Sequence, residues 1–133
     1  MLFRSARFGL SHLVSAGNAA VLDMPEYLHY LAQAPETRAV ALFMETMRDP
    51  AAFAHAMQAM HRAGKPVVAL KVGKSKRGAA ASAAHTGALA GSADAHAAFF
   101  EAHGVISVND LDEMTESLAL MLHLRQQIGR AHV

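Results

Sequence analysis

One segment of the chain combines a nucleophilic side chain with a backbone rich in glycine and alanine. Residues 73–92 carry mainly small and polar side chains, and His85 lies among them. The segment is much longer than the usual strand-to-helix connection of about 2–6 residues. Backbone amides in such a loop can approach an anion closely, and a neutral imidazole is a nucleophile near neutral pH. Residues 73–92 are therefore a candidate site for phosphate chemistry at His85, although a plain surface loop with a solvated histidine would have the same composition.

A carboxylate occupies a comparable position one apolar run earlier. Glu45 follows the run at residues 39–44, and His85 comes after a second run at residues 67–72. Ligands of open α/β sheets bind beyond the carboxyl ends of the strands, so we expect both side chains at the same edge of a sheet. The alternative for Glu45 is a solvated carboxylate that precedes the next helix.

Three further features are weaker candidates. Lys71 ends the second run and could face a phosphate, but we favour a lysine at the sheet edge whose ammonium reaches solvent. The basic run at residues 74–77 either attracts a nucleotide or is simply solvated. The Gly-Asn pair at residues 17–18 fits an ordinary turn as well as a ligand contact.

Composition argues against several classes of function. The chain has no cysteine, which excludes disulfides, a thiolate nucleophile and a thiolate metal site. Its nine histidines show no HxxxH or HExxH spacing, so we expect no metal site. The net charge of +1, with Lys and Arg mostly scattered, argues against nucleic acid. No apolar run approaches the roughly 20 residues that span a bilayer, and the N-terminus does not resemble a signal peptide.

The elements that must position these residues are visible as short apolar runs and helix signals. Runs at residues 8–14, 39–44, 67–72 and 105–108 predict buried strands. Asp23, followed by Glu26, predicts a helix that ends near Gln33, and Asp49 with its following proline predicts one that ends at Gly64. We expect further helices over residues 88–103 and from residue 110 onward. The side chains expected in the core are Leu28, Leu31, Phe53, Met57, Met60, Leu111, Met114, Leu118, Met121 and Leu122.

Strands that alternate with helices through short connections predict an α/β fold. A parallel sheet formed in this way is covered by helices on both faces. The sequence therefore predicts a three-layer open parallel sheet.

Several motifs resemble one known family. Residues 85–92 read HTGALAGS and closely resemble the SHTGALAGS signature of the NDP-forming acyl-CoA synthetases, with Ala84 in place of the family's Ser. Residues 8–18 (FGLSHLVSAGN) are similar to GFSHFVSxGN, and residues 65–74 (KPVVALKVGK) to KPVVVLKxGR. Residues 35–40 (PETRAV) and 104–113 (GVISVNDLDE) are similar to the family's DPETR and GVIRVDDLDE. The resemblance covers residues 6–127 and implies the succinyl-CoA-ligase-like, flavodoxin-like domain of these enzymes.

The resemblance also implies a reaction and roles for individual residues. The family converts a carboxylic acid, NTP and CoA into acyl-CoA, NDP and phosphate. His85 corresponds to the histidine that is phosphorylated, and the phosphate-binding residues would be Thr86, Gly87, Ala88 and Leu89. Glu45 corresponds to the glutamate that holds the other ring nitrogen. Residues 44–47 read METM and lack the glycine of the family's LEGI, so the loop here can have a different shape.

The family's cofactors and partners follow from the same resemblance. CoA and ATP/ADP with Mg²⁺ would be substrates bound mainly by a CoA-binding Rossmann domain and an ATP-grasp domain, and the acid would be a small carboxylic acid. The resemblance implies a cytoplasmic protein with neither a nucleic acid nor a membrane as partner. The alternative is a non-catalytic ligand-sensing or regulatory domain of a fused protein acetyltransferase; the complete HTGALAGS string favours catalysis.

The two ends of the chain suggest a partial domain. Residues 1–5 (MLFRS) and 128–133 (IGRAHV) resemble translations of the two strands of a sequencing adapter, which would leave residues 6–127 as natural sequence. The family's domain has a further strand and helix before residue 8. In its 2-1-3-4-5 strand order that strand is central, so the strand at residues 8–14 would lose its partner. We therefore expect the isolated chain to be inactive and marginally stable.

Overall fold

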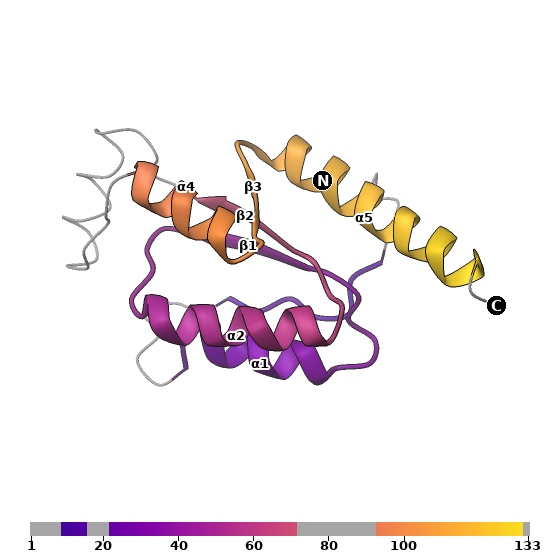
Figure 1. The fold of residues 1–133 in the computed structure, drawn as a ribbon, viewed down its shortest axis with the longest axis horizontal. Coiled ribbons are helices and arrows are strands. Elements are labelled where there is room, and N and C mark those ends of the chain that lie inside the picture. Colours follow the sequence, from indigo (N-terminus) through magenta and orange to yellow (C-terminus); the bar gives the residue numbers. More distant parts are fainter. Residues whose placement is uncertain (1–8, 16–21, 72–92, 132–133) are drawn as a thin grey trace.

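The computed structural model describes residues 9–15, 22–71 and 93–131, with side chains to residue 127 (Figure 1). Its elements are α1 (Met24–Gln33), β1 (Val40–Met44), α2 (Pro50–Arg62), β2 (Val67–Lys71), α4 (Ala93–Ala102), β3 (Ile106–Val108) and α5 (Leu111–Ala131). Three of the expected strands are thus present, and their described ends agree to within one residue with the apolar runs at residues 39–44, 67–72 and 105–108. The expected order of strands and helices is confirmed over residues 22–71 and 93–131.

The three strands form one parallel sheet in the order β1-β2-β3. β1 pairs with β2 from Val40↔Val67 to Met44↔Lys71, and β2 pairs with β3 from Val68↔Ile106 to Leu70↔Val108. β2 is therefore the middle strand, and all five of its residues are buried. A strand that is buried on both faces reads as a continuous apolar run, which explains the VVAL of this segment.

Helices cover both faces of the sheet, as expected for three layers (Figure 1). Val67 and Ala69 point into the larger core, where they pack with residues of α1, α2 and α4. Val68 and Leu70 point to the opposite face and pack with Met114 and Leu118 of α5. This alternation follows from the two-residue period of a strand. The fold is the predicted α/β fold. The buried side chains of the larger core include Leu28, Phe53, Met57, Met60 and Phe100.

The helix starts are as the sequence predicts. The Asp23 carboxylate accepts a hydrogen bond from the Met24 N–H (2.7 Å), and Glu26 accepts one from the Asp23 N–H (2.9 Å), so the capping box forms. The Asp49 carboxylate accepts from the Ala52 N–H at 2.9 Å, with proline as the first residue of α2. These contacts satisfy N–H groups that have no partner within the helix.

The expected strand at residues 8–14 is wrong over its described part. Residues 9–15 form no strand, and Leu10 and Leu13 are 54% and 81% exposed. A strand is stabilised by main-chain pairing with a neighbour, but the contact between this segment and the fold runs through side chains. The hydroxyl groups of Ser11 and Thr37 are 3.0 Å apart, and His12 Nε2 lies 3.4 Å from Glu36 Oε1.

Two helices differ in part from the expectation. Residues 88–92, expected to begin the third helix, lie outside the described residues, as does Val72 at the end of a predicted strand. In α5, Leu111 is 40% exposed, and Met121 and Leu122 are half-buried. The reason is length, because 21 helical residues span about 30 Å and the five residues of β2 span only about 17 Å, so α5 extends past the sheet. Leu31 of α1 is half-buried against the larger core.

Candidate functional site

β1 and β2 end side by side, and the chain leaves the sheet there at two neighbouring points. Met44 and Lys71 are the last pair of the ladder. Glu45 is the next residue after β1, and residue 72 opens the segment that contains His85. The expected phosphate-site residues His85, Thr86, Gly87, Ala88 and Leu89 lie outside the described residues, as do residues 17–18 and 74–77. The structure therefore places Glu45 beside the start of the histidine-bearing segment.

Glu45 is held through its main chain. Its side chain is exposed at the edge of the sheet where the strands end. Its carbonyl oxygen accepts a hydrogen bond from Lys71 Nζ at 3.2 Å. The position of the residue is thus defined by β1 and by a cation on the neighbouring strand, while its carboxylate faces solvent.

Lys71 differs from the sequence-based interpretation. We expected a lysine at the sheet edge with its ammonium in solvent, but β2 is the middle strand and Lys71 is only 5% exposed. Charged side chains are almost never buried to this degree unless they are paired. The sequence offered Lys71 only as a weaker candidate for the site and did not predict its burial. The available signal was a charged residue directly after four apolar residues of a parallel strand.

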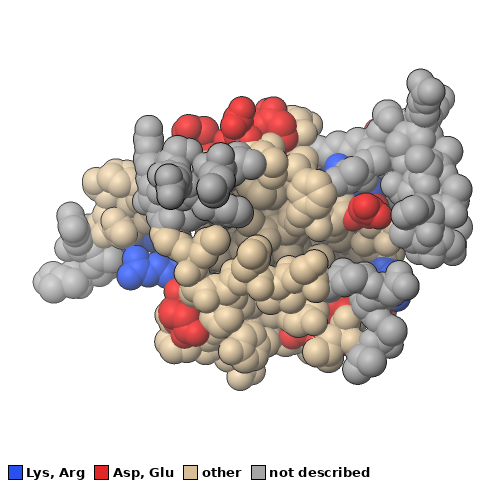
Figure 2. All heavy atoms as spheres, turned by 180° about the vertical axis from the view of Figure 1, so that it is seen from behind, with Lys and Arg blue, Asp and Glu red and all other residues tan. Residues whose placement is uncertain are grey.

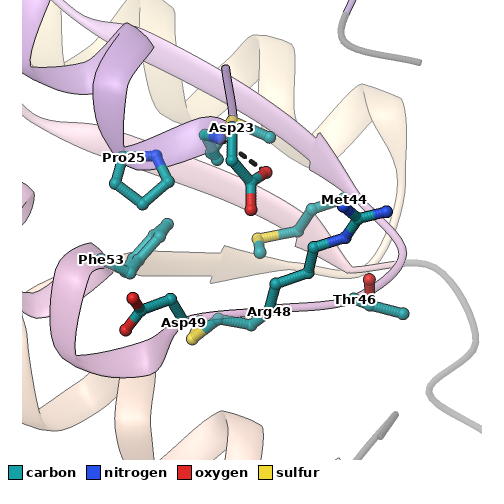
Figure 3. Close-up of a pocket in the computed structure, with 9 residues that line it drawn as sticks. Asp23, Pro25, Met44, Thr46, Arg48, Asp49 and Phe53 are labelled. Atoms are coloured by element: carbon teal, nitrogen blue, oxygen red, sulfur yellow. Dashed lines mark hydrogen bonds between the residues drawn. The ribbon is translucent and has the colours of Figure 1, made fainter. Parts of the chain in front are cut away.

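A small hollow lies beside the end of β1 (Figure 3). Met44 and Phe53 contribute apolar atoms to it, while Asp23 and Asp49 enter from the N-terminal ends of α1 and α2. Both carboxylates already accept hydrogen bonds from helix N–H groups. The two carboxylates of this hollow therefore serve to begin the helices. The other residues that line it are Met24, Pro25, Thr46, Met47 and Arg48.

Four of the described histidines lie in two pairs. His61 Nε2 is 2.9 Å from the His103 carbonyl oxygen, and the rings of His29 and His55 are 5.2 Å apart. Over residues 9–15, 22–71 and 93–127, no three His, Asp or Glu side chains come close enough together to hold a metal ion.

The described surface has a mixed charge. On the face shown in Figure 2, the described Lys, Arg, Asp and Glu atoms form separate groups around a largely uncharged area. Among the helices that the structure describes, none combines the length and apolarity needed to cross a membrane.

Comparison with known proteins identifies the family of this domain. The family described as "Succinyl-CoA ligase like flavodoxin domain" matches residues 2–121. The chain is 40% identical over 118 residues to acetate–CoA ligase [ADP-forming] I of Archaeoglobus fulgidus, which covers 89% of this chain and 17% of the relative. It is 42% identical over 106 residues to the alpha subunit of acetate–CoA ligase [ADP-forming] II of Pyrococcus furiosus, covering 80% of this chain and 23% of the relative.

A solved structure gives the same result. The dinucleotide-forming acetyl-coenzyme A synthetase 1 of Ca. Korarchaeum cryptofilum, in complex with phosphate and ADP, matches with a TM-score of 0.69 and 27% identity. The match covers 77% of this chain and 22% of that one. The chain therefore spans about a fifth of the length of these relatives. From the match over residues 2–121 and these identities, this chain belongs to the succinyl-CoA-ligase-like flavodoxin domain family.

Proposed function

We propose that this chain is the phosphohistidine-carrying domain of an NDP-forming acyl-CoA synthetase. In this proposal it works with a CoA-binding domain and a nucleotide-binding domain of the ATP-grasp type, which together convert a carboxylic acid, ATP and CoA into acyl-CoA, ADP and phosphate. His85 receives and donates the phosphoryl group, and Glu45 orients its ring. The relatives named above are ADP-forming ligases or synthetases, and no described residue favours a regulatory domain instead.

One observation carries the proposal. The parallel pairing of β1 with β2 brings Glu45 beside the point where the His85 segment leaves the sheet. A carboxylate that accepts a hydrogen bond from one nitrogen of an imidazole selects the tautomer in which the other nitrogen has a free lone pair. That arrangement suits a histidine that must attack phosphorus.

The reaction proposed for His85 is a phosphoryl transfer in two steps. A ring nitrogen of the neutral imidazole attacks the γ-phosphorus of ATP, so that a P–N bond forms while the P–O bond to ADP breaks. The imidazole becomes a phosphoimidazole, and its second nitrogen keeps a proton that Glu45 accepts as a hydrogen bond. Backbone N–H groups of residues 87–89 would bind the phosphoryl oxygens. A carboxylate oxygen of the acid then attacks phosphorus, so that an acyl phosphate forms while the P–N bond breaks and the ring becomes neutral again. The CoA thiol attacks the acyl carbon, loses its proton and displaces phosphate, which gives acyl-CoA.

The test uses the complete ligase in which this domain works, incubated with Mg²⁺ and ATP labelled in its γ-phosphate. We expect one protein-bound label per domain that is lost in acid and kept in base, as for a phosphoramidate. His85→Asn abolishes the label. His123→Asn is the matched control, because His123 is an exposed histidine on α5, and it keeps the label. A label that survives in His85→Asn, or an acid-stable label, contradicts the proposal.

A further inference from the structure

Lys71 is buried at the position in the fold where a charge is hardest to accommodate. It is the last residue of β2, the middle strand, and its exposed fraction is 5%. Removing an ammonium group from water is unfavourable unless hydrogen bonds replace its hydration. The other residues of β2 are Val, Ala and Leu, whose apolar side chains can be buried without hydrogen bonds. A lysine here therefore requires a reason beyond packing.

One contact of Lys71 points to that reason. Its Nζ donates to the Glu45 carbonyl oxygen at 3.2 Å. The β1–β2 ladder ends at the pair Met44↔Lys71, so this carbonyl lies one residue beyond the last paired residue of β1. Main-chain carbonyls need a hydrogen-bond partner wherever water is excluded. The lysine side chain thus extends the connection between the two strands past the end of the ladder.

We propose that Lys71 is the positioning residue for Glu45. By holding the Glu45 carbonyl, the ammonium fixes the direction in which the chain leaves β1, and with it the direction in which the Glu45 carboxylate extends toward the edge of the sheet. Residues 44–47 lack a glycine, so the turn after β1 is held from outside by this contact. The inference rests on the proposed function, because it gives Lys71 a role only through the glutamate that orients His85.

The test compares single and double variants of the complete ligase by the rate of His85 phosphorylation from Mg²⁺ and labelled ATP. A misplaced catalytic group typically slows a reaction by up to about 100-fold, so we expect Lys71→Met to slow phosphorylation about 10- to 100-fold. The decisive variant is Glu45→Gln combined with Lys71→Met. If Lys71 acts through Glu45, the double variant is as slow as Glu45→Gln alone, because two residues that act as one unit are not additive. A lysine that merely stabilises the fold would slow the Glu45→Gln enzyme further.

Lys71→Arg is the second variant, for the case in which Lys71→Met does not fold. The guanidinium keeps the charge and can donate to a carbonyl, but its planar geometry differs from that of an ammonium. We expect Lys71→Arg to fold and to phosphorylate His85 more slowly than the wild type. The double variant with Glu45→Gln should be as slow as Glu45→Gln alone. Wild-type rates in both Lys71 variants, or slowing that multiplies with that of Glu45→Gln, overturn the positioning role. Absence of label on wild-type His85 overturns the proposed function itself, so the two failures are distinct.

Discussion

The two edges of the sheet differ in the residues found there. At the edge where the strands begin, the helices end at cationic and glycine residues. At the edge where the strands end, the helices begin at carboxylates, and the candidate site lies at this edge. We refer to these as the amino edge and the carboxyl edge of the sheet. Lys65 Nζ at the amino edge donates to the carbonyls of Leu31 (2.8 Å) and Ala34 (2.7 Å). Arg125 donates to the Arg38 carbonyl at 2.9 Å. The Leu31 and Ala34 carbonyls also accept the N–H groups of Ala34 and Thr37, so Lys65 adds a second donor to each at the end of α1.

The same kind of contact serves a different purpose at the carboxyl edge. There Lys71 also donates to a main-chain carbonyl, but the carbonyl belongs to Glu45, the residue proposed to orient His85. The carboxyl ends of parallel strands are where ligands bind in open α/β sheets. A lysine that donates to a main-chain carbonyl can therefore stabilise a helix end at one edge of the sheet and position a site residue at the other. Substitution of the amino-edge cations should therefore change stability, whereas substitution of Lys71 or Glu45 at the carboxyl edge should change activity.

The largest effect on activity is expected from Glu45→Gln. Gln keeps the size of the side chain but is a weaker acceptor, so phosphorylation of His85 in the complete ligase should slow about 10- to 100-fold, equivalent to about 1.4–2.7 kcal/mol. The Glu45 side chain is exposed, so the melting temperature should stay the same. Glu36→Gln is the control at the amino edge, where an exposed carboxylate is changed in the same way and the rate should be unaffected. Equal slowing by both variants would remove the distinction between the edges.

The next effect is on stability at the amino edge, in a graded series of glycines. Gly104 has φ +69°, and an added Cβ would lie 2.6 Å from the His61 ring, so Gly104→Ala should destabilise by about 2–3 kcal/mol. Gly64 has φ +67°, but its nearest obstacle is the mobile end of Arg125 at 3.3 Å, which predicts about 1 kcal/mol for Gly64→Ala. Gly9→Ala meets nothing within 4 Å and should be neutral. Denaturant unfolding of the three variants measures the order, and any other order contradicts it.

Lys65→Met tests the cation of the amino edge. It removes two hydrogen bonds to carbonyls at the end of α1 while keeping most of the apolar stem, so we expect a loss of about 1–2 kcal/mol in the free energy of unfolding. Phosphorylation of His85 in the complete ligase should proceed at the wild-type rate. Arg62→Met, an exposed cation in the last turn of α2, is the control and should cost less. A Lys65→Met enzyme with wild-type stability but slowed phosphorylation of His85 would show that Lys65 and Lys71 have similar roles.

Among the variants that remove a hydrogen bond, the smallest effect is expected from Asp49→Ala. The variant removes the 2.9 Å hydrogen bond to the Ala52 N–H at the start of α2, which typically costs about 1 kcal/mol. Asp112→Ala is the matched control, because Asp112 lies in the first turn of α5 without being its N-cap residue. Chemical denaturation of both variants gives the difference. Equal losses would indicate that helix charge, and not the cap, accounts for the effect.

Much of the fold follows from short stretches of sequence. The capping box at Asp23, the Asp-Pro pair at residues 49–50 and the glycine after α2 predict helix ends to within about two residues, since caps depend on neighbours along the chain. The apolar runs likewise predict three strands from residues that are adjacent in the chain. The segment at residues 9–15 has a similar composition but forms no strand, because a strand also needs a partner that composition does not specify.

The candidate site shows the same division. Order along the chain predicted that Glu45 directly follows a strand, which the structure confirms, whereas the selection of Glu45 and His85 as site residues rests on the family resemblance and stays a prediction. The burial of Lys71 was not predicted, since it depends on β2 lying between β1 and β3 and on the helices that cover the face to which Val67 and Ala69 also point. Which strand lies in the middle is decided by pairing between residues far apart in the chain. Local preferences act over a few residues, whereas burial and strand order arise only when the sheet and its two helix layers assemble together.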